Sequence, residues 1–518
     1  MRAIILFLML LLAHGLLAQT PPELAWQGCS GGSGQEGSAV IDGTQDGGLI
    51  IASFTQSNNG QVTGYHGNTD IWVVKLDESG SIQWQRCLGG SGYDAPAGVH
   101  ATSDGGYLAV GFTNSTDGDV SGNHGSSDAW VVKLTATGEI EWQRAYGGTG
   151  AENARASLIK PNGNLVIVGA SSTANGDVTS NAGSADVWVL ELDPAGNLVW
   201  QSSYGGPSED TGWAMGLAED GSILALGVVF ANGGLVQGVH GANDIWVLRL
   251  TPQGDLLWRR CIGGTDYDWA FGATKAANGD WLIVGSTDSN DGDVAGYHGM
   301  SDAWIVRLDD DGELAWQRPL GGSGSESIGS VVELNDGSLL IPGGTNSSDG
   351  DVQGMPQSTD AWVLNLSGDG GTIHWQTLFG GSGNEGLYRM HRESVTGFTL
   401  SGSTASNDGD VFGNHGNTDA WLARITPLSG VGERGSEQLV SVYPNPAQDA
   451  LWAHVPEGWD AALRYSLFDA TGQLALMGQL PDVPVAAAID LSRLSAGAYA
   501  LVLQDRERLA FGKVTVAR

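Results

Sequence analysis

Acidic side chains recur in this sequence at spacings that suit a metal ion. In the stretch STDGDVSGNHGSSDAW, Asp117, Asp119 and Ser121 occupy positions 1, 3 and 5 of a twelve-residue loop, and Asp128 occupies position 12. Calcium loops place oxygen ligands at these positions and a glycine at position 6, which Gly122 supplies. The chemistry that this pattern offers is cation binding rather than catalysis.

Six further copies of the loop weaken the calcium interpretation. Position 12 is Asp in every copy, but position 1 is Asp in only four, and position 5 varies from Thr to Phe. Two or three carboxylates leave much of a calcium shell of roughly six to eight oxygens to carbonyls and water. We therefore expect a structural turn with, at most, weak calcium binding, and no other cofactor. The candidate ligands are Asp117, Asp119, Ser121, Asp128, Asp291, Asp293, Asp349, Asp351, Asp408 and Asp410.

A second set of acids follows the Gly-Gly pair of each copy. Paired carboxylates could support glycoside hydrolysis or lyase chemistry, line a ligand-binding face, or cap N–H groups of the loops. Catalysis needs asymmetry, whereas these acids recur in every copy, so we expect no catalytic residue among them. The candidate ligand face consists of Glu36, Asp94, Glu152, Asp210, Asp268, Glu326 and Glu385.

Other reactive residues are better explained by packing. The G-x-S-x-G match at residues 28–32 is expected by chance among 81 glycines. Three cysteines share a repeat position that elsewhere holds Ala, Ser, Pro and Leu, which favours packing over a disulfide. Five of the loops have a histidine directly before a glycine at the same position, which predicts a turn-packing role. These histidines are His66, His124, His240, His298 and His415.

The elements that position these residues follow two tryptophan series. Each series advances by 58 residues five times and then by 59, and together they hold 14 of the 19 tryptophans. Each unit has four strand-like runs joined by Gly-containing turns, as in residues 97–113 and 128–144. Four antiparallel strands per unit predict the blades of a β-propeller. Small residues on the first strand and Trp on the third and fourth support radial stacking. The two series are Trp26, Trp84, Trp142, Trp200, Trp258, Trp316 and Trp375, and Trp72, Trp130, Trp188, Trp246, Trp304, Trp362 and Trp421.

The two ends of the repeat region are complementary. PPELAWQGC supplies a fourth strand alone, and the last repeat ends after its third strand, DAWLARI. Pairing them would remove two open edges. We therefore predict seven blades, with the seventh built from both ends.

The units DAWVVKLTATGEIEWQRAYGGTG and DGGYLAVGFTNSTDGDV resemble the bacterial β-propeller repeat sometimes called SBBP. The tail contains VSVYPNPAQDAL, YSLFDATGQLAL and IDLSRLSAGAYALVL in this order, and it resembles the C-terminal sorting domain of the type IX secretion system. The second resemblance implies handling by the type IX machinery and release from the cell or attachment to its surface. Alternating apolar and polar residues predict a small immunoglobulin-like β-sandwich for this tail.

The expected organisation is a signal peptide at 1–18, a propeller at 19–427, a linker at 428–438 and the sorting domain at 439–518. Arg2 followed by a short apolar run favours secretion over a transmembrane anchor. The formal net charge of −35 disfavours nucleic acid as a partner.

Three functions remain open. We expect a secreted or surface-bound, non-enzymatic binding or adhesion protein whose extracellular ligand is a glycan or a protein. The alternatives are a carbohydrate-active hydrolase or lyase on a propeller scaffold, and a purely structural surface protein. An enzyme should show one sector that departs from the repeat.

Overall fold

The computed structural model describes residues 21–37, 39–394 and 397–426, and in the C-terminal region residues 442–443, 447–448, 450–454, 464–468, 474–480, 486–504 and 509–517. The chain divides into two compact units, Met1–Val431 and Gly432–Arg518. The described residues form strands and turns and contain no helix. The expected signal peptide at 1–18 and linker at 428–438 lie outside the described residues.

The first unit is a ring of seven antiparallel sheets, as predicted. Six sheets follow the chain order, and the seventh combines strands from both ends of the unit. The blades are, in order, β2 (Val40–Gly43), β3 (Leu49–Thr55), β4 (Asp70–Leu76), β5 (Ile82–Leu88); β6 (Asp94–Ala101), β7 (Tyr107–Thr113), β8 (Asp128–Leu134), β9 (Ile140–Tyr146); β10 (Glu152–Ile159), β11 (Leu165–Ser171), β12 (Asp186–Leu192), β13 (Leu198–Tyr204); β14 (Asp210–Leu217), β15 (Ile223–Val229), β16 (Asp244–Leu250), β17 (Leu256–Ile262); β18 (Asp268–Lys275), β19 (Trp281–Thr287), β20 (Asp302–Leu308), β21 (Leu314–Leu320); β22 (Glu326–Ile328), β23 (Val332–Glu333), β24 (Leu339–Thr345), β25 (Asp360–Leu366), β26 (Ile373–Phe379); and β27 (Glu385–Arg392), β28 (Phe398–Thr404), β29 (Asp419–Ile425) with β1 (Leu24–Ser30).

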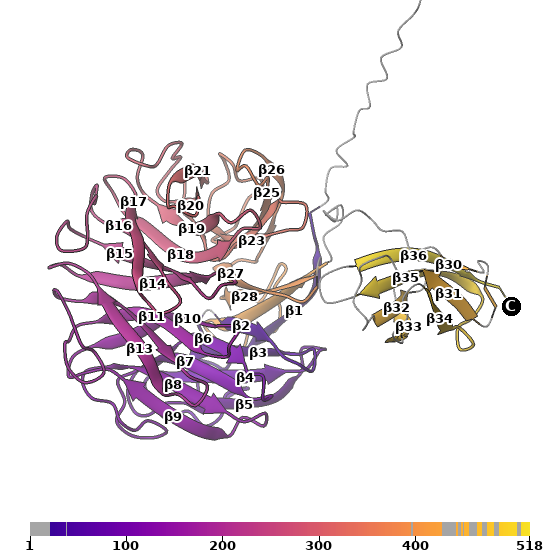
Figure 1. Ribbon diagram of the computed structural model, residues 1–518, viewed down its shortest axis with the longest axis horizontal. Coiled ribbons are helices and arrows are strands. Elements are labelled where there is room, and N and C mark those ends of the chain that lie inside the picture. Colours follow the sequence, from indigo (N-terminus) through magenta and orange to yellow (C-terminus); the bar gives the residue numbers. More distant parts are fainter. Residues whose placement is uncertain are drawn as a thin grey trace, which may run out of the picture. The chain divides into compact units, whose positions relative to one another are not determined.

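The first strand of each blade is the innermost. Figure 1 shows β6, β10 and β14 near the middle of the ring and β9, β13 and β17 near its edge. The third-strand tryptophans are at most 1% exposed and pack between neighbouring blades. Trp72 of the first blade, for example, lies in one cluster with Ala420 and Leu422 of the seventh. Large rings fill the space where the blades splay apart, which is the packing that the tryptophan series predicts.

The ring closes where the sequence predicts. Strand β1 pairs antiparallel with β29, from Leu24 opposite Ile425 to Ser30 opposite Ala420. The Gln27 side chain of β1 also accepts a hydrogen bond from Trp421 Nε1 at 2.9 Å. The seventh blade therefore contains both ends of the propeller.

A β-bulge interrupts the innermost strand of five blades at the same place. In β10, for example, the pairing skips from Ala154 to Ala156, so that Arg155 is the extra residue. A bulge redirects the side chain of the residue that it inserts. The equivalent positions in the first and sixth blades are Ala39 and Gly329. The inserted residues are Ala97, Arg155, Trp213, Phe271 and Tyr388.

The second unit contains two antiparallel sheets that share one apolar core. Leu451 and Leu501 are fully buried in that core. The immunoglobulin-like form of this unit stays a prediction. One sheet is β30 (Val442–Tyr443), β31 (Ala450–His454) and β34 (Ala486–Asp490), and the other is β33 (Leu474–Gln479), β32 (Arg464–Phe468), β35 (Gly497–Gln504) and β36 (Leu509–Val516).

Deletion of residues 21–30 should destabilise the whole propeller. The deletion removes the pairing partner of β29 and leaves Trp421 Nε1 without Gln27, so we expect the free energy of unfolding to fall by about 3–6 kcal/mol. Urea unfolding followed by Trp fluorescence measures the change. A synthetic peptide of residues 21–30 should restore much of the loss, whereas a scrambled peptide should not. Equal stability of the truncated and intact proteins would contradict closure through β1.

Candidate functional site

The junction acids lie inside the propeller rather than on a ligand face. All seven side chains are at most 3% exposed. In each blade the carboxylate accepts the N–H of the second glycine of the Gly-Gly pair, as Asp94 does from Gly90 at 2.8 Å. This burial does not support the candidate ligand face, and the carboxylates cap loop N–H groups, which is the alternative that the sequence also allows. The other pairs are Glu36 with Gly32, Glu152 with Gly148, Asp210 with Gly206, Asp268 with Gly264, Glu326 with Gly322 and Glu385 with Gly381, at 2.6–2.9 Å.

A second buried carboxylate faces each junction acid. It belongs to the Asp that begins the third strand. In the second blade, a Cβ on Gly147 would lie 2.7 Å from Asp128 Oδ1 and 2.8 Å from Glu152 Oε2. Only glycine fits between two such carboxylates. The Oδ1 atom of this second acid has no hydrogen-bond partner among the described residues in six blades, at Asp70, Asp128, Asp186, Asp302, Asp360 and Asp419.

Burial raises the pKa of these third-strand acids above the ordinary range of aspartate. Burial is the largest cause at Asp360, where the charges of Glu385 and Asp410 add to it, and the pKa rises to about 6. The junction acids Asp210 and Asp268 are also raised to about 6, again mainly by burial. These blades therefore take up protons in the folded state near pH 6.

The side chain at the first position serves as a hydrogen-bond acceptor in six of the seven loops. Asp117 Oδ1 accepts the N–H of Ser91 from the preceding junction at 2.7 Å. Asn59 accepts the equivalent N–H of Ser33 at 2.8 Å. Asp and Asn interchange because the position needs an oxygen acceptor rather than a charge. The same bond is made by Asp291, Asp349 and Asp408.

The remaining candidate ligands have other partners. Asp119 lies 3.9 Å from Arg86 and 3.8 Å from His66, while Asp128 binds the ring of His124 at 2.6 Å. Ser121 accepts a hydrogen bond from Gln143. Within the described residues, no group of three or more His, Cys, Asp or Glu side chains is placed to hold a metal ion. Weak calcium binding stays a prediction. The related acids Asp293 and Asp410 accept glycine N–H groups, and Asp351 pairs with Arg318.

The histidines and cysteines take structural places. The ring of each of the five loop histidines contacts the Asp at the start of the next strand at 2.6–2.7 Å, so the turn-packing role is confirmed. Cys29, Cys87 and Cys261 are unpaired and buried. Burial raises the pKa of Cys29 to about 12, which keeps this thiol uncharged.

The blades differ from one another at the ring axis. A cavity of about 220 Å³ is lined by the innermost segments of all seven blades. A pocket of about 310 Å³ shares Phe271 and Arg389 with this cavity. We call it the axial pocket. Its lining consists of Phe54, Tyr93, Ala95, Pro96, Phe112, Ala154, Arg155, Trp213, Phe271 and Arg389.

The axial pocket combines aromatic rings with two guanidinium groups. The exposed Arg155 side chain lies 4.7 Å from the ring of Trp213 and 5.6 Å from that of Phe112. Among the described residues it has no ion pair or hydrogen bond. Arg389 donates to the backbone oxygens of Phe271 at 2.9 Å and Gly329 at 2.7 Å, and thereby fixes the pocket floor.

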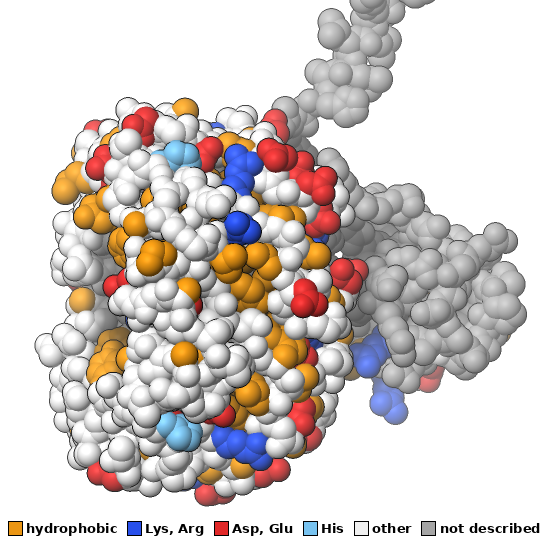
Figure 2. Space-filling model, turned by 60° about the vertical axis from the view of Figure 1, so that its left-hand side comes forward, with side chains coloured by type: hydrophobic (Ala, Val, Ile, Leu, Met, Phe, Trp, Pro, Cys, Tyr) orange, Lys and Arg blue, Asp and Glu red, His pale blue; other side chains and the backbone are white. Residues whose placement is uncertain are grey.

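Contacts with its neighbours hold Trp213 at the axial pocket. On the face of the propeller that Figure 2 shows, Lys and Arg side chains are fewer than acidic ones. Trp213 also contacts Trp269 edge to face, with ring centroids 5.5 Å apart, and its Nε1 donates to Thr211 at 3.1 Å. These contacts hold the ring of Trp213 in place at the pocket.

A Ser–His pair lies in the axial cavity. His100 Nε2 and Ser157 Oγ are 2.8 Å apart, which is the distance between a nucleophile and its base. Burial lowers the pKa of His100, so its ring is neutral at neutral pH. Among the described residues no hydrogen bond orients the other ring nitrogen. The pair therefore lacks the third member that orients the base in known triads.

Sequence reasoning missed the axial residues because it searched loops for irregularity. The signal lies on the innermost strand, where the bulge position varies from Ala97 to Arg155 and Trp213. An alignment of the seven units at this single position would have found it.

Stability should fall as pH rises from 5 to 8. A raised pKa means that the folded state holds more protons than the unfolded chain, so the stabilising protonated form is lost as pH rises through about 6. Replacing Asp360→Asn should reduce this fall by about 1–3 kcal/mol. Urea unfolding at several pH values measures it, with the exposed Asp311→Asn as control. An identical pH dependence in both variants would contradict the burial argument.

Comparison with known proteins identifies the tail. Residues 441–517 match the family described as the secretion system C-terminal sorting domain. Of the predicted tail motifs, residues 444–446 and 469–472 lie outside the described residues, while Leu494 and Tyr499 are buried in the unit's core.

The propeller is similar to proteins of diverse kinds. The chain is 26% identical over 210 residues to the regulatory protein FlaEY of Caulobacter vibrioides, and the match covers 36% of this chain and 22% of that protein. A Dyadobacter fermentans protein of unknown function aligns at 12% identity and TM-score 0.41, over 78% of this chain and 99% of its own. The polysaccharide lyase Uly1 aligns at 10% identity and TM-score 0.45, over 75% and 89%.

The described residues include no helix with the length and apolar character needed to cross a membrane. The sorting domain directs export to the cell surface or the medium. The chain is thus a secreted seven-bladed β-propeller protein that carries a type IX secretion system C-terminal sorting domain.

Proposed function

We propose that this chain is a non-enzymatic binding protein at or outside the cell surface, and that the axial pocket holds a sugar ring of an extracellular glycan. The observation that carries the proposal is the Arg155 guanidinium, which lies between two aromatic rings without an ion pair among the described residues. Aromatic rings offer apolar faces to the C–H groups of a sugar, and a guanidinium offers several N–H donors to its oxygens.

The asymmetry of the pocket supports binding over a purely structural role. The inserted residue is large in the third, fourth, fifth and seventh blades and small elsewhere. Ring packing alone does not require this difference, because Ala97 occupies the same bulge as Trp213. The pocket volume of about 310 Å³ is within the usual size of a small-molecule site, although at its lower end.

A second candidate is an extracellular hydrolase that uses Ser157 and His100. The 2.8 Å contact of Ser157 Oγ with the neutral ring of His100 favours it. The burial of Ser157, which is 7% exposed, disfavours it because a substrate must reach the reacting oxygen.

A glycan array probed with the secreted protein tests the proposal. We expect binding to a defined set of glycans, and a loss of at least about tenfold in affinity for Trp213→Ala and Arg155→Ala. The matched control is Tyr267→Ala, because Tyr267 occupies the repeat position of Tyr93 but does not line the pocket. Its affinity should change by less than about twofold.

Three outcomes would contradict the proposal. The first is an array without bound glycans. The second is equal weakening by Trp213→Ala and Tyr267→Ala. The third is cleavage of the bound glycan that disappears in Ser157→Ala, which would favour the hydrolase.

A further inference from the structure

The fourth blade breaks a contact that the other six blades share. In those six, Nε1 of the third-strand tryptophan donates to the side-chain oxygen of a glutamine on the fourth strand, at 2.7–2.9 Å. The amide nitrogen of the same glutamine donates to the loop before the third strand, as Gln201 does to Thr179 at 2.6 Å. A planar amide thus joins the buried indole to the loop. The six pairs are Trp72 with Gln85, Trp130 with Gln143, Trp188 with Gln201, Trp304 with Gln317, Trp362 with Gln376 and Trp421 with Gln27.

Arg259 replaces this glutamine in the fourth blade. A guanidinium has no hydrogen-bond acceptor, so Arg259 cannot accept a hydrogen bond from the indole N–H. Arg259 Nε instead donates to the backbone oxygen of Leu235. Trp246 is 0% exposed, and its Nε1 has no hydrogen-bond partner among the described residues. A buried unpaired donor of this kind costs about 1–3 kcal/mol.

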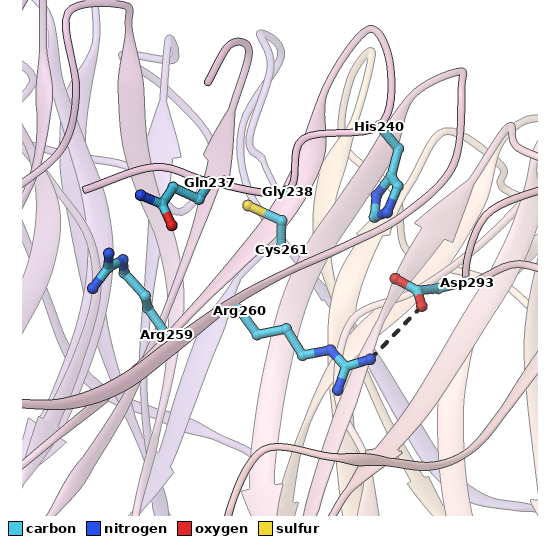
Figure 3. A pocket seen from close by; sticks show the side chains of 7 residues that line it. All are labelled: Gln237, Gly238, His240, Arg259, Arg260, Cys261 and Asp293. Atoms are coloured by element: carbon cyan, nitrogen blue, oxygen red, sulfur yellow. Dashed lines mark ion pairs between the residues drawn. The ribbon is translucent and has the colours of Figure 1, made fainter. Parts of the chain in front are cut away.

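The replacement coincides with a cavity of about 480 Å³, which we call the fourth-blade pocket. Figure 3 shows the side chain of Arg260 extending toward Asp293, while the side chain of Arg259 lies on the other side of the view, near Gln237. In the second blade Gln143 bridges the indole and the loop, and Arg259, which takes the place of this glutamine in the fourth blade, lines the pocket. The lining residues are Gln237, Gly238, His240, Arg259, Arg260, Cys261 and Asp293.

The fourth-blade pocket favours an anion. It contains two guanidinium groups and one carboxylate, and Arg260 lies 3.8 Å from that carboxylate, Asp293. Arg260 also donates to the backbone oxygen of Gly312 at 3.0 Å, as arginines at the same place do in other blades. Burial raises the pKa of Cys261 to about 12, so the thiol adds no charge. Arg260 thus makes contacts that recur in other blades, whereas Arg259 is a cation that only the fourth blade has at this position.

We propose that the fourth-blade pocket binds a carboxylate, with one oxygen accepting the Trp246 N–H and Arg259 supplying the opposite charge. A carboxylate is planar and has nearly the shape of the primary amide that accepts this proton in the other blades, whereas phosphate is tetrahedral. The uronic acid of a glycan and the terminal carboxylate of a peptide share this chemistry. The proposal does not depend on the axial pocket.

The chain itself supplies the best test variant, R259Q, which restores the glutamine of the other blades. In the intact secreted protein with ¹⁵N-labelled tryptophan, the indole signal that differs between wild type and R259Q reports on Trp246. Titration with sodium acetate should move this signal in the wild type. R259Q should bind acetate at least about tenfold more weakly, because the side-chain oxygen of the new glutamine accepts the hydrogen bond from the Trp246 N–H. The melting temperature of R259Q without ligand should be higher than that of the wild type.

Further probes define the ligand. Acetamide and inorganic phosphate should have much weaker effects than acetate at equal concentration and ionic strength. Glucuronate represents the uronic acid of a glycan, and N-acetylglycinate represents the terminal carboxylate of a peptide. The probe that resembles the natural ligand should bind more tightly than acetate. The proposal is overturned if acetate leaves the indole signals in place, if R259Q responds as the wild type does, or if acetamide or phosphate matches acetate.

Discussion

A buried carboxylate that accepts a glycine N–H at each junction between blades is the contact on which the ring depends. The junction lies where one blade ends at the rim and the next begins at the axis, so its backbone donors are turned away from any sheet. Glu152 accepts the N–H of Gly148 at 2.7 Å, and its other oxygen accepts the hydroxyl of Ser171 at 2.9 Å. Hydrogen bonds to a charged acceptor contribute roughly 1.5–3 kcal/mol each. Repeating this contact seven times fixes the spacing of the blades.

A second set of contacts to the junction explains the composition of the loops. Gly118 has a φ of +65° and lies against the backbone oxygen of Gly89, so no other residue fits without strain. Asp117 on one side of it caps the preceding junction. The Asp-Gly-Asp pattern therefore follows from joining a loop to its neighbouring junction. The acids at the first position of these loops, such as Asp117, thus already accept backbone N–H groups, and the candidate functional residues lie where the blades differ from one another.

The sequence was sufficient to predict the seven blades and the closing strand, because periodic tryptophans and complementary ends leave few alternative folds, and the sorting tail was predicted from the resemblance of its motifs to a known family. It could not predict that Asp94 and its equivalents are buried, because an acid after Gly-Gly has the same pattern whether it faces solvent or a backbone N–H. Arg155 and Trp213 were missed because they lie on the variable inner strand, whereas the search for irregularity was directed at the loops. Arg259 was detectable in the sequence, because six of the seven fourth-strand tryptophans are followed by Gln and only Trp258 is followed by Arg. The consequence of this change became clear only from the structure, in which the Trp246 indole N–H has no partner among the described residues.

The central claim is that the loop acids act as hydrogen-bond acceptors for the ring rather than as metal ligands. Thermal unfolding of the wild type, Asp117→Asn and Asp117→Ala, each with and without millimolar calcium, tests it most directly. The account predicts that Asp117→Asn melts close to the wild type, because Asn59 makes the same bond in another blade. Asp117→Ala should lose about 1 kcal/mol of stability with no dependence on calcium. A large calcium-dependent stabilisation of the wild type that both variants reduce would contradict it.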